Sequence, residues 1–175
     1  MSLMYDNLFR RDRKKRELRD ILENNFIFED LSSRELSFIE TLVHVRKYRP
    51  GEFIFRQGEV GVGMFIIVNG SVDVTVESAT IDSPTDEATY VTRLKHGDFF
   101  GEIALIEENG RRTANAIAHN EVTVLGFFKP DLAELVDRNP VTGIKVYKKL
   151  SQVLGRRLRE TSNKITHLKK RIKRT

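Results

Sequence analysis

Two short runs of β-branched and aromatic residues stand on either side of a glycine in Met64-Phe65-Ile66-Ile67-Val68-Asn69-Gly70-Ser71-Val72-Asp73-Val74-Thr75-Val76. Residues of these types favour β-strands, and the glycine favours a turn between them. Further runs of the same kind lie between residues 51 and 129, at Phe53-Ile54-Phe55, Tyr90-Val91, Asn115-Ala116-Ile117-Ala118 and Val122-Thr123-Val124-Leu125. Short strands at even spacing with glycine turns predict a closed β-sandwich or barrel.

Helical patterns flank this β-region on both sides. We expect a helix over residues 7–24 and a second helix that begins at a capping box formed by Ser32 and Glu35. After the strands, a short helix is expected over residues 129–138, and Asn139-Pro140 supplies the cap and first turn of a long final helix. The fold class is therefore α+β and mainly β.

The composition is that of a folded protein without a membrane span. The 175 residues are 39% hydrophobic, and no stretch approaches the roughly 18 uncharged apolar residues of a membrane helix. The chain contains no cysteine, which excludes a disulfide framework, a thiol nucleophile and thiolate-bound zinc or iron–sulfur sites. No secretory signal is visible, because charged residues come before any apolar run. We expect a soluble, cytoplasmic protein.

The net charge of +5 is unevenly distributed along the chain. Residues 1–19 carry +4, residues 20–144 carry −10 and residues 145–175 carry +11. The basic termini therefore flank an acidic centre, which repels anions at long range. A basic helix of this kind can follow a phosphate backbone, lie on an anionic membrane or simply present a solvated face.

The final helix also carries an apolar seam. Alternating steps of four and three residues separate Leu154, Leu158, Thr161, Ile165, Leu168 and Ile172. This is the spacing of a coiled coil, so we expect a symmetric dimer that pairs through this helix. The alternative is that the seam packs against the chain's own barrel.

A glycine-rich polar stretch between residues 97 and 114 contains the candidate site. Gly101 lets the backbone approach a ligand closely, and Glu102 precedes a short apolar turn. Arg112 returns to the same place and supplies a fork of donors that matches a phosphate. Since a carboxylate repels phosphate, Glu102 is better suited to accept hydrogen bonds from a sugar hydroxyl. The alternative is a buried Glu102–Arg112 ion pair at a barrel turn.

This stretch resembles the phosphate-binding cassette of cyclic nucleotide-binding domains. The matching residues are Phe100-Gly101-Glu102-Ile103-Ala104-Leu105, six variable residues, and Arg112-Thr113-Ala114. The resemblance covers about residues 26–165, and turns such as Pro50-Gly51-Glu52 and Gln57-Gly58-Glu59 fall where the family has its β-roll turns. It implies a jelly-roll-like antiparallel β-roll with three parts, a basic N-terminal helical segment (1–25), the nucleotide-binding β-roll (26–138) and a long capping and dimerisation helix (139–175).

The resemblance also implies a role for each site residue. Arg112 would bind the phosphate of a 3′,5′-cyclic nucleotide, and Glu102 would accept a hydrogen bond from the ribose 2′-hydroxyl. Backbone N–H groups around Ile103, Ala104 and Ala114, together with the Thr113 hydroxyl, would complete the phosphate site next to Gly101, with apolar walls at Val91, Leu94 and Phe100.

A second resemblance lies in the long helix, at Arg156-Arg157-Leu158-Arg159-Glu160-Thr161-Ser162. It is similar to the base-capping helix of the bacterial catabolite activator family, which implies that Arg157, Thr161 and Ser162 reach an adenine, Ser162 from the other subunit. Thr113 could instead contact a guanine, as in relatives selective for cyclic GMP. We expect cyclic AMP, with cyclic GMP as the alternative.

These patterns predict a non-catalytic cyclic nucleotide sensor of bacterial type that signals through its final helix to a second copy or an effector protein. We expect no cofactor and no metal, because His44, His96, His119 and His167 are too scattered for the metal site of an enzyme on a similar barrel. No helix pair follows Ile172, so sequence-specific DNA reading is not expected. The alternatives are an interaction module without nucleotide binding, and a fragment that binds DNA non-specifically through the basic tail.

Overall fold

The computed structural model describes residues 16–77 and 88–172. Its strands are β1 (His44–Tyr48), β2 (Phe53–Phe55), β3 (Gly63–Asn69), β4 (Val72–Glu77), β5 (Ala88–Leu94), β6 (Phe99–Phe100), β7 (Asn115–Ala118) and β8 (Val122–Phe128). Residues 16–23 are helical, and the named helices are α2 (Ser33–Leu42), α3 (Ile103–Ile106), α4 (Lys129–Arg138) and α5 (Pro140–Ile172).

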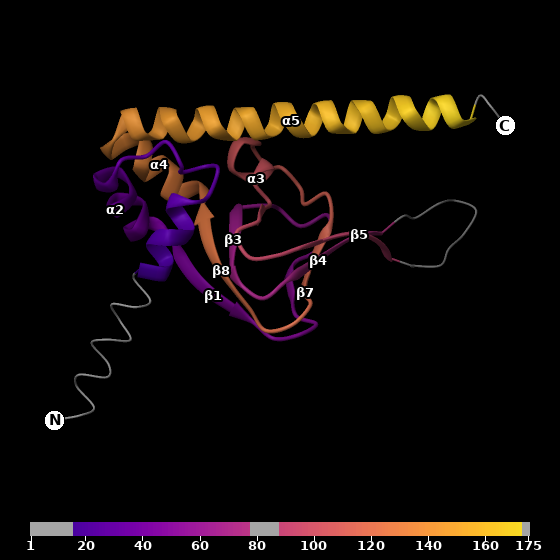
Figure 1. Cartoon of the computed structure of the whole chain (residues 1–175), viewed down its shortest axis with the longest axis horizontal. Coiled ribbons are helices and arrows are strands. Elements are labelled where there is room, and N and C mark those ends of the chain that lie inside the picture. The colour runs from indigo at the N-terminus through magenta and orange to yellow at the C-terminus, as the bar shows by residue number, and fades with distance from the viewer. Residues whose placement is uncertain (1–15, 78–87, 173–175) are drawn as a thin grey trace.

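The strands form two four-stranded sheets, in which every described pair is antiparallel. One sheet has the order β1-β8-β3-β6 and the other β2-β7-β4-β5. The helices lie at one end of this β-roll, with α5 running across the top above α3 and α4 (Figure 1). The expected antiparallel β-roll, with N-terminal helices and a long C-terminal helix, is confirmed.

Two strands were not predicted from the sequence. β1 contains Arg46-Lys47 and is largely exposed, so it lacks the apolar signal of a half-buried strand. β6 has only two residues, which is too short to show a period. The loop predicted over residues 78–88 lies outside the described residues except for Ala88, which begins β5. The helix predicted over residues 7–24 is described only from residue 16.

Two apolar cores divide the molecule between the roll and the helices. Inside the roll, side chains from both sheets meet, and they include Phe65, Val72, Phe100 and Val124. The other faces of β3 and β8 pack against the helical layer through a second cluster, whose fully buried members include Phe28, Ile39, Met64, Phe127, Leu135 and Leu150. The two faces of β3 are thus both covered by apolar side chains. This explains why its sequence is a continuous apolar run without alternating polar residues.

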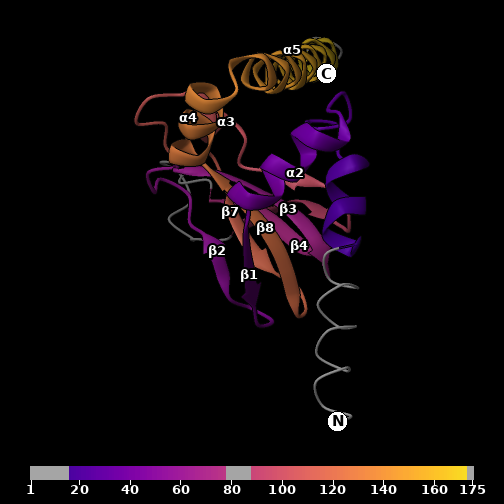
Figure 2. The same cartoon turned by 90° about the vertical axis from the view of Figure 1, so that its left-hand side faces the viewer.

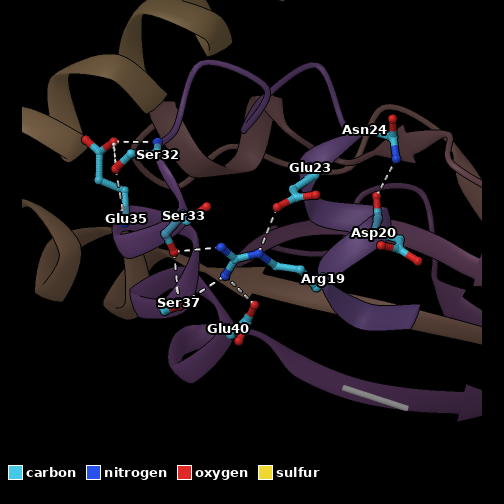
Figure 3. Close-up of polar contacts among 9 residues, drawn as sticks. All are labelled: Arg19, Asp20, Glu23, Asn24, Ser32, Ser33, Glu35, Ser37 and Glu40. Atoms are coloured by element: carbon cyan, nitrogen blue, oxygen red, sulfur yellow. Dashed lines mark hydrogen bonds and ion pairs between the residues drawn. The ribbon is translucent and has the colours of Figure 1, made fainter. Parts of the chain in front are cut away.

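The N-terminal helical residues are tied to α2 through Arg19 (Figure 3). Its guanidinium donates to Glu23 Oε1 at 3.0 Å, to Glu40 Oε1 at 2.7 Å and to the Ser33 carbonyl at 2.7 Å. The capping box predicted for α2 is present, because Glu35 N donates to the Ser32 hydroxyl and the Glu35 carboxylate accepts from Ser32 N. Figure 2 shows α2 and residues 16–23 packed beside the β1–β8 sheet, below α5.

Helix α5 divides into two segments with different surroundings. In the proximal segment (residues 140–157), Val146, Leu150 and Val153 are buried against the helical layer. In the distal segment (residues 158–172), every side chain that the structure describes is exposed. Leu158 is 70% exposed and Ile165 is 48% exposed, so packing of the seam against the chain's own barrel does not hold for these two residues.

Candidate functional site

The predicted phosphate site lies at the one-turn helix α3, beneath the middle of α5 (Figure 1). β6 ends at Phe100, Gly101 turns the chain with a φ of 77°, and Glu102 begins the short turn. The turn is closed by Ala104 N, which donates to the Gly101 carbonyl at 3.2 Å, and by Leu105 N, which donates to the Glu102 carbonyl at 3.0 Å. The apolar residues Ala104 and Leu105 are buried and fix this turn against the roll.

Arg112 is brought to this turn by the chain that leads into β7. Its side chain is 7% exposed, and its guanidinium donates to the Gly63 carbonyl at 2.8 Å and to the Gly101 carbonyl at 3.1 Å. The Phe55 ring lies beneath the guanidinium, 4.0 Å from ring centroid to Cζ. Burial lowers the pKa of Arg112, while Glu59 and Glu102 act to raise it. Because Arg112 forms no salt bridge with any residue that the structure describes, its charge is suited to an incoming anion.

Two glycines, Gly61 and Gly101, leave room for the Arg112 side chain to lie against the α3 turn. A Cβ at Gly101 would collide with Arg112 Nη1, and a Cβ at Gly61 would lie 2.5 Å from the Ala104 Cβ and 3.3 Å from Arg112 Nε. The site predicted from the sequence does not include Gly61, Gly63 or Phe55. Paired glycines indicate a close backbone approach, so the run Gly61-Val62-Gly63 was a sequence signal for the first two of these residues.

Glu102 is fully buried, with 0% exposure. Arg157 of α5 lies beside it, with Nη1 2.7 Å from Glu102 Oε1, but neither carboxylate oxygen accepts an aligned hydrogen bond from a described residue. Burial raises the pKa of Glu102, and the charges of Arg157 and Arg112 oppose this rise. A buried carboxylate without aligned donors is costly, so it is a ready acceptor for a hydroxyl group.

The ion pair of Glu102 corrects one prediction and modifies another. The alternative that Glu102 pairs with Arg112 is wrong, because Arg112 donates to backbone carbonyls and Arg157 takes the place beside the carboxylate. Arg157 was assigned to the base, yet in the structure it contacts the expected ribose acceptor. The sequence could not show this, because α5 and α3 are joined by tertiary packing alone.

The remaining predicted site residues differ in how deeply they are buried and in what they contact. Ile103 and Ala114 are half-buried and Thr113 is exposed beside Arg112. Thr161 and Ser162 lie on exposed turns of α5, and the structure describes no contact from either side chain to Glu102 or Arg112. Of the predicted walls, Phe100 is buried in the roll and stacks on Phe65 at 5.6 Å, Leu94 packs against the same core, and Val91 is 54% exposed.

The described residues also bear on metal binding and membrane insertion. No group of three or more histidine or acidic side chains in this part of the chain is placed to hold a metal ion. Helices of the length and apolarity that a membrane crossing requires are likewise absent from residues 16–77 and 88–172.

Comparison with known proteins identifies the family. The cyclic nucleotide-binding domain matches residues 45–139, which is more than half of the chain. The chain therefore belongs to the cyclic nucleotide-binding domain family. The matched range contains the turn at Gly101, Glu102 and Arg112.

Individual relatives come from channels, kinases and transcription regulators. The chain is 38% identical to the dog cyclic nucleotide-gated channel beta-3 over 112 residues, covering 63% of this chain and 13% of the channel. It is 34% identical to the mouse cGMP-dependent protein kinase 2 over 125 residues, covering 70% of this chain and 16% of the kinase. The crystal structure of Thermus thermophilus catabolite activator protein matches with a TM-score of 0.71 and 27% identity, covering 82% of this chain and 63% of that one. The chain thus spans only a small part of its curated relatives.

Proposed function

We propose that this protein is a non-catalytic regulatory sensor that binds a 3′,5′-cyclic nucleotide, with cyclic AMP as its ligand, in a bacterial cytoplasm. Residues 26–138 would form the binding module and residues 139–175 the output helix. The observation that carries the proposal is the pairing of two buried, incompletely satisfied groups at one turn. Arg112 has a charge without a carboxylate partner among the described residues, and Glu102 has a carboxylate without aligned donors there.

The two groups fit opposite ends of the same ligand. Arg112 would exchange its contacts with the Gly63 and Gly101 carbonyls for charge-assisted hydrogen bonds to the cyclic phosphate, which are roughly twice as strong as neutral ones. Glu102 would accept a hydrogen bond from the ribose 2′-hydroxyl. Backbone N–H groups near Ile103, Ala104 and Ala114, together with the Thr113 hydroxyl, would complete the phosphate contacts.

The base preference rests on α5. Arg157 lies beside Glu102, and Thr161 follows it by about one turn on the same face of α5, so a small movement of the helix would bring Thr161 to an adenine. Ser162 would reach the adenine from the other subunit. The alternative ligand is cyclic GMP, which Thr113 would favour through the guanine amino group. The similarity to a kinase named for its dependence on cGMP supports that alternative.

The Arg157–Glu102 contact is also the proposed route of the signal. A ribose hydroxyl at Glu102 changes the partners of the carboxylate that holds Arg157, and therefore changes how α5 is held. A ligand shifts such an equilibrium only through its different affinity for the two arrangements. The distal segment would pass this change to a second copy of the chain, since Leu158 and Ile165 present an exposed apolar seam.

A thermal-shift series with cyclic AMP, cyclic GMP and 5′-AMP tests the ligand. A ligand at a hundred times its Kd that binds only the folded state adds about 2.7 kcal/mol of stability, so a clear rise in Tm is expected with cyclic AMP. We expect a smaller rise with cyclic GMP and none with 5′-AMP, which lacks the cyclic phosphate. No shift with either cyclic nucleotide would reject the sensor and favour an interaction module.

Sedimentation of a seam variant tests the dimer. Leu158→Asp, Ile165→Asp and Leu168→Asp together should give a monomer, because they place three carboxylates in the paired face. The control introduces three carboxylates on other faces of the same helix turns, with Asn163→Asp, Thr166→Asp and His167→Asp, and should remain dimeric. A monomeric wild type, or a seam variant that stays dimeric, would reject this interface.

A further inference from the structure

The cations of α5 differ in whether a carboxylate pairs with them, and the exposed Lys148 and Arg156 are the two in the proximal segment without such a pair among the described residues. In the proximal segment, Lys145 pairs with Glu35 at 2.8 Å and Lys149 pairs with Asp30 at 2.9 Å. Arg157 pairs with Glu102 at 2.7 Å. Beyond Arg157 the pattern stops, because no carboxylate of residues 16–77 or 88–172 pairs with Arg159, Lys164, Lys169 or Lys170.

We propose that the distal segment binds the sugar-phosphate backbone of a duplex nucleic acid without reading its sequence. The four unpaired cations are all exposed, and Glu160 is the single acidic residue in the stretch. They stand on a helix that extends past α3 along the top of the molecule (Figure 1). A cation that is fully hydrated and unpaired can displace counterions from phosphate without first breaking an ion pair within the protein.

The spacing of these cations suits a line of phosphates. From Arg159 to Lys170 the helix rises by about 17 Å, whereas a duplex carries one phosphate charge per roughly 1.7 Å of its axis. At 100° per residue, Arg159 and Lys170 lie on one side of the helix, well away from Leu158 and Ile165, whereas Lys164 and Lys169 flank the apolar seam on its two sides. A duplex that lies along the helix can therefore be contacted through Arg159 and Lys170 while the apolar seam is engaged elsewhere.

A duplex fits this segment better than an anionic membrane does. The apolar seam is narrow and includes Thr161, so it offers little area for insertion into lipid. Residues 20–144 carry a net charge of −10, and a flat anionic surface that reached the helix would also face this acidic body. A rod-shaped polyanion can instead contact the projecting segment and remain away from the rest of the domain.

The arrangement of charges in the proposed dimer also favours the binding of a polyanion. In a parallel pair aligned on Leu158 and Ile165, Lys164 of one helix flanks the seam opposite Lys169 of the other. Like charges at such positions are destabilising, and a bound polyanion would offset this repulsion. The nucleic-acid site does not depend on cyclic nucleotide binding, so the two proposals can fail separately.

The test measures fluorescence anisotropy of a labelled 30-base-pair DNA duplex between 50 and 200 mM salt. The variant carries Arg159→Gln, Lys164→Gln, Lys169→Gln and Lys170→Gln. The control removes the same charge from exposed sites on the body, with Arg34→Gln, Lys47→Gln, Arg49→Gln and Lys95→Gln. Wild type should bind two unrelated duplex sequences equally, and its affinity should fall steeply with salt.

The distal variant should bind about tenfold or more weakly at 100 mM salt, and its salt slope should fall by about one for each phosphate that is no longer neutralised. The body control should stay within about twofold of wild type. Equal losses in both variants, or no binding at 50 mM salt, would overturn the proposal. Tighter binding to phosphatidylserine vesicles than to duplex at equal phosphate would also overturn it, in favour of a membrane. A thermal shift with cyclic AMP that is unchanged in the distal variant would show that the nucleotide site is intact.

Discussion

The proximal and distal segments of α5 belong to one continuous helix but have opposite surroundings. The proximal segment buries Val146, Leu150 and Val153, and its Lys145 and Lys149 pair with carboxylates from the N-terminal helical region. The distal segment is exposed, with cations unpaired among the described residues and an uncovered apolar seam. The boundary between the two segments is Arg157, which contacts Glu102 at the candidate site.

This contrast shows that packing against the domain ends partway along α5. The proximal segment is packed against the domain, and the contact of Arg157 with Glu102 lies where this packing ends. Helical propensity alone would treat the two segments alike. The difference arises from tertiary packing, and it predicts that substitutions in the two segments have different kinds of effect.

The largest expected effect is at Leu150, which is 0% exposed. Leu150→Ala should lower the free energy of unfolding by about 2–5 kcal/mol, because it removes buried methyl groups and leaves a cavity. The matched change in the distal segment, Leu158→Ala, should act only through association. Urea unfolding at several protein concentrations separates the two. A concentration-independent loss of several kcal/mol in Leu158→Ala would contradict the contrast between the segments.

The next effect is at Glu35, which joins the start of α2 to the proximal segment. It accepts hydrogen bonds from the Thr142 hydroxyl at 2.9 Å and from Lys145 Nζ at 2.8 Å. Burial acts to raise the pKa of Glu35, but hydrogen bonds from Lys145 and Ser32 outweigh it and lower the pKa to about 2. Glu35→Gln should therefore cost about 2 kcal/mol of stability at pH 7.

The pH dependence of that loss has a defined sign. Because the folded pKa is lowered, the stabilisation by Glu35 is complete above the ordinary pKa of 4.5 and disappears as the pH falls towards 2. Urea unfolding of wild type and Glu35→Gln should thus converge below pH 4.5. The control Glu134→Gln, in an exposed pair with Arg138 on α4, should change stability by less than about 0.5 kcal/mol at any pH. A Glu35→Gln deficit that persists unchanged at low pH would contradict this assignment.

A smaller effect distinguishes two arginines that lie two residues apart. Arg157→Gln removes the cation beside Glu102 and should weaken cyclic AMP binding by about tenfold, equivalent to about 1.4 kcal/mol. Arg159→Gln, beyond the boundary, should leave the affinity within about twofold of wild type. Titration calorimetry measures both. Equal affinities in the two variants would remove Arg157 from the site.

The sequence predicted local features better than long-range ones. The capping box of Ser32 and Glu35 is a local pattern, and the structure contains it. The contacts of Glu35 with Thr142 and Lys145 join residues more than 100 positions apart, and no local pattern indicates them. β1 was missed for a related reason, since its charged residues form a strand only because β8 pairs with it.

The candidate site shows the same limit. The spacing of Gly101, Glu102 and Arg112 led to the family, because these residues lie on one continuous segment. Arg112 contacts Gly63 of β3 and Phe55 of β2, which are far from it in the sequence. The sequence shows that a glycine and an aromatic residue occupy these positions, but not that they lie next to Arg112. Arg157 was placed at the ligand by resemblance, but its contact with Glu102 depends on how α5 crosses the roll.

The most direct test of the central claim is a calorimetric titration of cyclic AMP into wild type and Arg112→Gln. Wild type should bind one nucleotide per chain, and Arg112→Gln should bind at least about a hundredfold more weakly, because hydrogen bonds to a charged group contribute about 1.5–3 kcal/mol each. Arg111→Gln, an exposed neighbour, serves as the control and should bind normally. Circular dichroism of Arg112→Gln checks that it is folded. No binding by wild type, or undiminished binding by a folded Arg112→Gln variant, would contradict the assignment of this turn as the nucleotide site.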